Sequence, residues 1–356
     1  MKSLGNFPDP FIAEIAGQPD ALRRAAEALH EQAAILHEIV GVAGSASLVF
    51  TGMGSSYDAC YPAVTQLARD GIAAVMVDSA ELLHFRTGML GSHTTLVAIS
   101  QSGESAEVVR VVENVRGRAD PPRVIAVTNG TGNTLASLAD LVVDTRAGQE
   151  TGPSTMTFAA SLVAVGAIGH LLGGLDVAET VRGCREQADL AAGAIEGLLS
   201  DATLADRIVD RIGPCGTVVI LGRGPARASA EMGALTVKEA VGMPIESLQT
   251  AQFRHGPLEL AGPDLAALII ATEPETSALD LTLAEELLAT GASVVTVTAD
   301  PGGPQAAMNI AIGPVGSTLA PAVSILPAQL LAWRLSILRG REPGAYYRAS
   351  KVTIRE

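Results

Sequence analysis

Short apolar runs alternate with amphipathic segments along most of the chain. Runs such as TTLVAI and RVIAVT each contain four consecutive apolar residues, and the segment after the first of them repeats Val108, Val112 and Val115 at helical spacing. Strands that are apolar on both faces are typical of parallel sheets covered by helices on both sides. The pattern therefore predicts an α/β protein.

The alternation occurs twice. SLVFTGMGSSYDACYPAV at 47–64 and TVVILGRGPARASAEMGA at 217–234 share an apolar strand, a Gly-x-Gly turn and a helix-like segment. The same offset, within two residues, relates TTLVAISQSGES to AALIIATEPETS and RVIAVTNG to SVVTVTAD. A fixed offset between similar segments indicates a duplicated unit. We predict two tandem doubly wound parallel-sheet domains.

The segments outside the two copies read as helices and a loop. Leu22, Ala26, Leu29 and Ala33 follow helical spacing, and the Ala/Glu-rich stretch after the first copy is typical of a linker helix. The tail GREPGAYYRASKVTIRE contains proline, glycine and four basic residues and is expected to be a loop that packs onto the body. The predicted division is a helical segment at 1–45, a first domain at 46–175, a linker helix at 176–200, a second domain at 201–335 and a tail at 336–356.

Composition restricts the class of protein. With 48% hydrophobic residues and 17% charged residues, the chain of 356 residues is typical of a globular protein. The formal net charge of −14 and the lack of a Lys/Arg-rich block argue against nucleic acid as a partner. The longest apolar stretches contain His170, Pro321 or Pro327, and no signal-like segment opens the chain, so we expect no membrane span. The cysteines Cys60, Cys184 and Cys215 lack paired spacing, which favours buried thiols in the cytoplasm.

Hydroxyl-rich clusters follow two predicted strands of the first copy. GMGSSY supplies Ser55 and Ser56, and ISQSGES supplies Ser100, Gln101, Ser102 and Ser105. Ligands of doubly wound sheets bind beyond the carboxyl ends of strands, where backbone N–H groups and helix dipoles favour anions. The second copy has Glu273 and Pro274 at the equivalent turn, a negative charge and a missing N–H donor. We therefore predict a phosphate site confined to the first domain.

A nucleotide is disfavoured as the phosphate carrier. Tyr57 stands where G-x-G-x-x-G requires its third glycine, and the chain contains no G-x-x-x-x-G-K-[ST] motif. The histidines form no pair with ligand spacing, so no metal and no other cofactor is predicted. The serines could also be ordinary helix caps, although two clusters absent from the second copy favour a binding role.

The order of six motifs resembles the sugar isomerase (SIS) domain family. These motifs are GMGSSY, SQSGES, TNGTGNTLASLADLVVDTRAGQETGPSTMTF, LGRGPARASAEMGALTVKEA, FRHGPLEL and the closing SKVTIRE. The resemblance covers nearly the whole chain, and is strongest to the isomerase half of glucosamine-6-phosphate synthase and its free-standing relatives. It implies tandem flavodoxin-like SIS domains and a sugar-phosphate ligand.

The resemblance also implies catalytic roles for three residues. Glu239 in LTVKEA corresponds to the family's proton-shuttling glutamate, and Lys351 in SKVT corresponds to the lysine that forms a Schiff base with the open-chain ketose. His255 in RHGP corresponds to the ring-opening histidine, which the neighbouring subunit contributes, so the resemblance implies a homodimer. Pro257 suits the first turn of a new helix after this histidine.

Two departures from the synthase pattern stand out. In PSTMTF, Met156 occupies the position of a family lysine, whereas Ser154 and Thr155 match and are expected to line the sugar. YYRAS replaces the Leu-containing segment that usually precedes the catalytic lysine in the family. This difference affects the placement of Lys351 and the shape of the site around the amino end of the sugar. Glu150 fits the pattern in GQETG, but the motif assigns it no role.

Three functions are compatible with these residues. The first is an enzyme that converts glucosamine 6-phosphate to fructose 6-phosphate and ammonia, and the second is a fructosamine-6-phosphate deglycase in which Tyr346 and Tyr347 contact the aglycone. The third is a sugar-phosphate sensor without catalysis, which would need none of Glu239, His255 and Lys351. Met1 is followed by Lys2 rather than the cysteine nucleophile of the synthase, so no glutaminase activity is expected.

Overall fold

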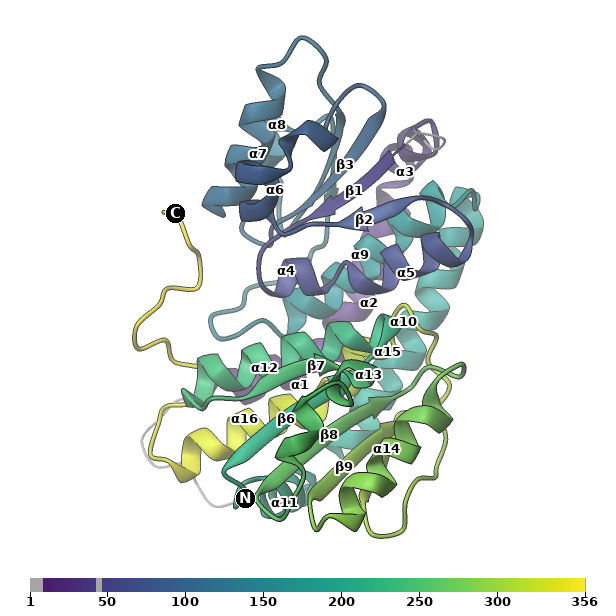
Figure 1. Cartoon of the computed structure of the whole chain (residues 1–356). Coiled ribbons are helices and arrows are strands. Elements are labelled where there is room, and N and C mark those ends of the chain that lie inside the picture. The colour runs from purple at the N-terminus through teal and green to yellow at the C-terminus, as the bar shows by residue number, and fades with distance from the viewer. Residues whose placement is uncertain (1–8, 43–46, 356) are drawn as a thin grey trace. The chain divides into compact units, whose positions relative to one another are not determined.

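The computed structural model describes residues 9–42 and 47–355, which form two compact units. We call the unit made of Asp20–Glu150, Thr155–Asp189 and the tail from Arg348 the first unit. The second unit comprises the residues up to Pro19, Thr151–Ser154 and Leu190–Tyr347. Each unit is built around one parallel sheet (Figure 1).

The sheet of the first unit has five parallel strands in the order β2-β1-β3-β4-β5. The strands are β1 (Ser47–Thr51), β2 (Ala74–Met76), β3 (Thr94–Ile99), β4 (Arg123–Thr128) and β5 (Leu141–Asp144). The chain moves to one side of β1 to form β2 and then crosses to the other side to form β3. This reversal creates a topological switch point between β1 and β3, where doubly wound sheets bind their ligands.

Helices cover both faces of this sheet. On one face lie α6 (Ser79–Phe85), α7 (Ala106–Arg116) and α8 (Thr134–Leu138), and on the other lie α3 (Ala33–Val40), α4 (Ser55–Asp58), α5 (Tyr61–Arg69) and α9 (Met156–Leu172) (Figure 1). Alternate strand residues such as Leu96 and Ala98 pack against Val108, Val112 and Val115 of α7. The helical spacing in the sequence thus marked the core face of α7.

The second unit repeats the first topology. Its parallel strands lie in the order β10-β9-β8-β6-β7, which is the same winding as that of the first sheet. They are β6 (Thr217–Gly222), β7 (Glu246–Gln249), β8 (Leu265–Ala271), β9 (Ser293–Thr298) and β10 (Met308–Ala311). The starts of β1 and β6, β3 and β8, and β4 and β9 differ by 170 or 171 positions. The predicted duplication is confirmed.

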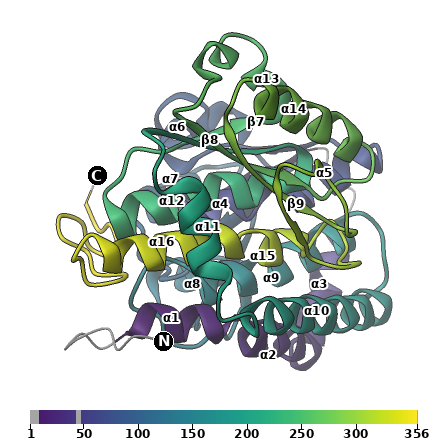
Figure 2. The same cartoon turned by 90° about the horizontal axis from the view of Figure 1, so that it is seen from below.

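Helices of the second unit also cover both faces of their sheet. The unit contains α1 (Pro10–Ala16), α11 (Leu204–Ile212), α12 (Arg227–Val241), α13 (Thr250–Phe253), α14 (Ser277–Ala289), α15 (Ala320–Ser324) and α16 (Leu326–Leu338). α13 and α14 supply Phe253, Leu283 and Leu287 to the core on β6 and β8. Figure 2 shows α11 crossing α16, which packs against both α11 and α12.

Within residues 9–42 and 47–355, one stretch, Ala320–Leu338, is long and apolar enough to cross a membrane by length and composition alone. It includes Pro321 and Pro327 at the starts of α15 and α16, and 83% of its most apolar window is buried in the protein. Ser324 and Ser336 lie inside it as buried, hydrogen-bonded polar residues. Its apolar composition is therefore accounted for by packing within the second unit.

The linker segment forms one long helix, α10 (Val177–Leu199), whose first half lies in the first unit against α2 (Gln18–Glu31). Arg185 of α10 pairs with Glu27 of α2, and Asp189 accepts a hydrogen bond of 3.3 Å from Nε of Arg23. α1, in the second unit, contacts α16 and is attached to it by a 2.8 Å bond from Trp333 Nε1 to Asp9 Oδ2.

The cysteines lie apart from one another as free thiols. Cys60 and Cys184 are buried, and burial raises the pKa of the Cys184 thiol to about 12. Burial, followed by the neighbouring Asp58 charge, also raises the pKa of the Cys60 thiol far above its usual range. Both thiols therefore behave as small apolar side chains, as expected from the sequence.

Candidate functional site

The two hydroxyl clusters follow the two strands that flank the switch point of the first unit. Ser55 and Ser56 come after β1, and Ser100, Gln101, Ser102 and Ser105 come after β3, which pairs with β1 in parallel. Because the carboxyl ends of parallel strands meet at one edge of a sheet, the clusters belong to the same edge. This placement agrees with the phosphate site predicted from the sequence.

The turn after β3 is organised by its own hydroxyl groups. Ser100 Oγ accepts a 3.1 Å hydrogen bond from the Gly103 N–H and lies 3.0 Å from Ser105 Oγ. Ser102 Oγ accepts from the Glu104 N–H at 3.1 Å. Gly103 has a φ of 67°, and a Cβ there would lie 1.9 Å from Asn133 Oδ1, so this turn requires glycine. The hydroxyls are thus held in place by the protein itself.

The turn after β1 depends on a close backbone approach. A Cβ on Gly52 would lie 2.9 Å from the carbonyl carbon of Ser56 and 3.1 Å from the carbonyl oxygen of Ile99. Without a side chain at this position, the turn can lie against the end of β3. Ser55 and Ser56 are the first two residues of α4, and Ser56 is buried. The absence of a third glycine at Tyr57 does not prevent this turn from forming.

The tail reaches the same region of the first unit. Ser105 is the N-cap of α7, and the first N–H of the helix, that of Ala106, donates a 3.1 Å hydrogen bond to the carbonyl oxygen of Thr353. The exposed N-terminal N–H groups of a helix favour anions. Here one of them holds the tail, which places the residues around Thr353 beside the hydroxyl cluster after β3.

The equivalent edge of the second unit is occupied by its own side chains. After β6, Arg223 pairs with Asp280 at 2.6 Å, and the Asp280 side chain is 1% exposed. Burial raises the pKa of the Asp280 carboxyl, although Arg223 and neighbouring hydroxyls oppose this effect. After β8, Glu273 is buried and accepts a 2.8 Å bond from Ser317 Oγ. A carboxylate therefore stands where an anionic ligand would need donors, as the sequence indicated.

Glu239 and His255 lie in the second unit. Glu239 is two residues from the end of α12 and is partly buried, whereas Lys238 beside it is exposed. His255 is exposed between α13 and a short 3-10 helix, Pro257–Leu260, which begins with proline as predicted. Its backbone N–H donates to the Gln252 carbonyl oxygen at 3.0 Å. The catalytic roles of Glu239 and His255 stay predictions.

Lys351 lies in the first unit, although it is only five residues from the last residue of the chain. Its Nζ is 2.8 Å from Glu150 Oε2, and its side chain is 19% exposed while that of Glu150 is fully buried. The carboxylate of Glu150 accepts four further hydrogen bonds, from the N–H and hydroxyl groups of Thr155 and Thr157. Five donors thus hold this buried charge.

Sequence reasoning left Glu150 without a role, and the signal that could have indicated one is the distribution of lysine. Of 24 basic residues only Lys2, Lys238 and Lys351 are lysines, so 24 − 3 = 21 are arginines. Arginine and lysine are alike as surface charges, but only lysine readily loses its proton to become a nucleophile. A lysine kept in an arginine-rich chain is therefore a candidate for chemistry, and its carboxylate partner becomes a candidate too.

One of the two residues expected to line the sugar contacts this pair. Thr155 is the N-cap of α9 and is buried, and both its N–H and its hydroxyl donate to Glu150. Ser154 precedes it on the segment that the second unit includes. Met156, at the position of the family lysine, is 8% exposed and begins α9. The methionine therefore packs into the first unit and supplies no positive charge.

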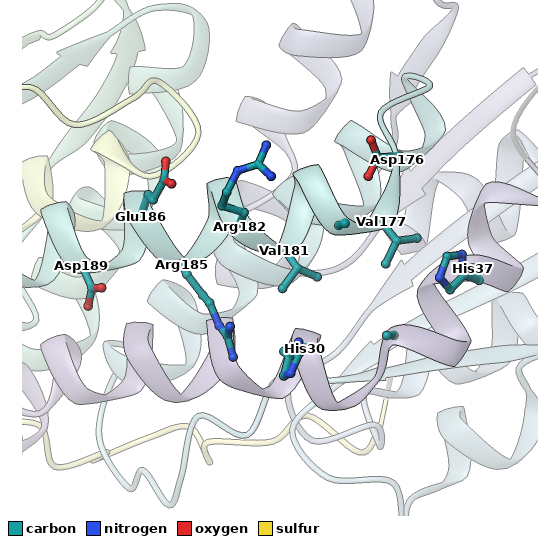
Figure 3. Close-up of a pocket in the computed structure, with 11 residues that line it drawn as sticks. His30, His37, Asp176, Val177, Val181, Arg182, Arg185, Glu186 and Asp189 are labelled. Atoms are coloured by element: carbon teal, nitrogen blue, oxygen red, sulfur yellow. The ribbon is translucent and has the colours of Figure 1, made fainter.

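A cavity of about 590 Å³ lies elsewhere in the first unit, between α2, α3 and α10. Figure 3 shows His30 and His37 on one side, and Asp176 with the α10 residues from Val177 to Asp189 on the other, with Arg185 directed toward α2. It shares no residue with the hydroxyl clusters, Glu150 or Lys351. The volume of a cavity therefore does not identify the predicted phosphate site. That site is indicated by the polar groups of the turns after β1 and β3.

Comparison with known proteins decides the family. The SIS domain model matches residues 42–171 and 212–339, one match over each sheet. The chain belongs to the SIS domain family. It is 31% identical over 354 residues to a glutamine–fructose-6-phosphate aminotransferase (isomerizing) of Pyrobaculum aerophilum, covering 96% of this chain and 57% of that protein. The corresponding enzyme of Aeropyrum pernix is 32% identical, with 96% and 56% covered. This SIS protein therefore spans somewhat more than half the length of these relatives.

Solved structures share the fold of this SIS protein at lower identity. The C-terminal domain of glucosamine-fructose-6-phosphate aminotransferase from Francisella tularensis matches with a TM-score of 0.82 and 21% identity, over 95% of this chain and 98% of that one. Glucosamine-6-phosphate deaminase from Thermotoga maritima matches with a TM-score of 0.77 and 19% identity, over 97% and 99%. The similarity establishes the predicted tandem α/β architecture.

Proposed function

We propose that this SIS protein is an enzyme acting on an amino-sugar phosphate, which converts glucosamine 6-phosphate and water to fructose 6-phosphate and ammonia. The observation that carries the proposal is the position of Lys351. An amine able to form an imine is held by a buried carboxylate in the same unit as the predicted phosphate cluster. Phosphate binding alone would require no such amine.

The phosphate is bound at the switch point of the first unit. Ser56, Ser100 and Ser105 offer hydroxyl donors and the turn backbones offer N–H groups, so neutral dipoles hold the dianion. Met156 replaces a lysine of the synthase pattern. The hydroxyl and backbone N–H dipoles of the first unit therefore supply a larger share of the phosphate-binding free energy than they would if a lysine were present. This arrangement also suits a protein with a net charge of −14, because it binds an anion without a cluster of basic residues.

The chemistry follows three roles. His255 opens the sugar ring by moving a proton to the ring oxygen, and Glu239 moves a proton from C2 to C1 of the open chain through an enolic intermediate. The nitrogen at C2 then forms part of an imine, which the Lys351 amine attacks, so that ammonia leaves. Water hydrolyses the resulting lysine imine to the ketone of fructose 6-phosphate and frees the lysine.

We further propose a homodimer in which each subunit supplies His255 to its neighbour. The exposure of His255 supports this arrangement, because a ring-opening group must be excluded from bulk water to act efficiently.

The test is to incubate the purified protein with glucosamine 6-phosphate and, separately, with a fructosamine 6-phosphate, and to measure ammonia or released amine together with hexose phosphate. Release of ammonia and fructose 6-phosphate from the first substrate supports the deaminase. Turnover of the second substrate alone would replace the deaminase by a deglycase. Absence of turnover with intact binding of hexose 6-phosphates would overturn both and favour a sensor.

A further inference from the structure

The Glu150–Lys351 pair is organised more tightly than a surface ion pair. Glu150 Oε1 accepts hydrogen bonds from the Thr155 N–H at 2.8 Å, the Thr155 hydroxyl at 2.9 Å and the Thr157 N–H at 3.2 Å. Oε2 accepts from the Thr157 hydroxyl at 2.5 Å and from Lys351 Nζ at 2.8 Å. One oxygen is therefore fixed entirely by the start of α9, and the other is aimed at the lysine.

This arrangement has a specific electrostatic consequence. Moving a carboxylate out of water costs several kcal/mol unless hydrogen bonds and an opposite charge replace the lost solvent. The Thr155 and Thr157 groups supply the hydrogen bonds, and Lys351 supplies the charge. Since the Glu150 side chain has no contact with solvent, the site is built to hold one cation next to Oε2.

We propose that Glu150 is the positioning residue and counter-ion of Lys351, which holds the ammonium in the resting enzyme and then stabilises the protonated imine formed on the same nitrogen. The proposal rests on the imine chemistry of the proposed function. It assigns Glu150 a role in that chemistry without contact to the reacting carbon.

The chemical balance explains why one carboxylate serves both states. The Lys351 ammonium and a carbonyl group give a protonated imine and one molecule of water. A C–N bond forms, the C=O bond breaks, and the oxygen leaves with two of the three ammonium protons. The attacking nitrogen is the neutral amine, and it regains its positive charge in the protonated imine. Glu150 therefore faces a cation before and after the step. Stabilisation of the protonated imine favours its formation, both when the lysine displaces ammonia and when it captures the ketone of fructose 6-phosphate.

The first measurement needs no substrate. Trace acetylation of the full-length protein across a pH series, followed by peptide mass spectrometry, gives the pH at which the Lys351 amine becomes reactive, with the exposed Lys238 as internal reference. Removing a neighbouring negative charge disfavours an ammonium, so Glu150→Gln is expected to make Lys351 reactive at lower pH than in the wild type. Glu150→Asp keeps the charge at a longer distance from Lys351 and should therefore change the pH at which Lys351 reacts by a smaller amount. This variant replaces Glu150→Gln in the experiment if the Gln variant does not fold.

A matched control removes the same charge from an exposed position. Glu113→Gln on α7 should leave the Lys351 midpoint in place, and Lys238 should be unchanged in every variant. The proposal is overturned if the Lys351 midpoint is the same in the wild-type, Asp and Gln proteins. A merely structural role of Glu150 would lower the melting temperature and leave this midpoint unmoved.

The second measurement separates this proposal from the proposed function. Fructose 6-phosphate is added with borohydride, and the reduced adduct on Lys351 is quantified by mass spectrometry. Loss of the counter-ion should lower adduct formation by about ten- to hundredfold in Glu150→Gln, compared at a pH where each lysine is deprotonated. Equal adduct formation in both proteins would refute the counter-ion role. If the wild-type protein forms no adduct with any hexose phosphate, the proposed imine chemistry fails, whereas the midpoint shift still decides whether Glu150 positions the lysine.

Discussion

Replacing Gly52 by alanine places a methyl group against the backbone of the turn that follows β1. The new Cβ would lie 2.9 Å from the Ser56 carbonyl carbon and 3.0 Å from the Tyr57 nitrogen. Real Cβ contacts are longer, and backbone atoms cannot rotate away as a side chain can. The turn must therefore shift, and the Ser55 and Ser56 hydroxyls shift with it.

Two magnitudes follow from this geometry. Overpacking of this kind destabilises proteins by about 1 to 3 kcal/mol. If the shift also removes one hydrogen bond to the phosphate dianion, the loss of about 1.5 to 3 kcal/mol lowers hexose-6-phosphate affinity by roughly ten- to hundredfold. Gly52→Ala is expected to show both effects.

The duplication supplies the control. Gly222 occupies the same place in the second unit, and a Cβ there would lie 2.7 Å from the Ala226 carbonyl oxygen. Gly222→Ala should cause a similar loss of stability, measured by chemical denaturation, and leave affinity, measured by titration calorimetry, within about twofold of the wild type. Equal loss of affinity in the two variants, or unchanged affinity in Gly52→Ala, would refute a phosphate site confined to the first unit.

Three further predictions concern single residues. Glu239→Gln should abolish turnover while keeping phosphate-ligand affinity within about tenfold, and normal turnover would show that the base is misassigned. Mixing equal amounts of inactive Glu239→Gln and His255→Asn subunits should restore about a quarter of wild-type activity if His255 acts across a dimer, whereas no recovery places both residues on one chain. Burial lowers the pKa of His170, partly opposed by Asp70, so its neutral form is favoured in the folded state. Stability should fall as pH drops below about 6.5, and His170→Gln should flatten that decline in calorimetry.

The sequence alone determined the architecture, and it predicts which half binds phosphate. Periodicity specifies which strand and helix faces are buried, and these faces were read from the spacing of Val108, Val112 and Val115 and from the repeated offset of 170 positions. The contrast between ISQSGES and the Glu273-Pro274 turn can also be read from the sequence. The negative charge of Glu273 and the missing N–H donor of Pro274 are properties of the residues themselves, and both disfavour an anionic ligand at that turn. The catalytic assignments came from motif resemblance and stay predictions.

Only the tertiary structure decided which distant residues meet. Lys351 and Glu150 are 201 positions apart, and no spacing rule connects a tail lysine with a glutamate before α9. Their pairing depends on the tail, which is fixed at Thr353 by the Ala106 N–H, and on the buried hydroxyls of Thr155 and Thr157. Such a contact follows from the path of the chain in three dimensions, so it is absent from any local pattern, although the scarcity of lysine could have indicated one of its partners.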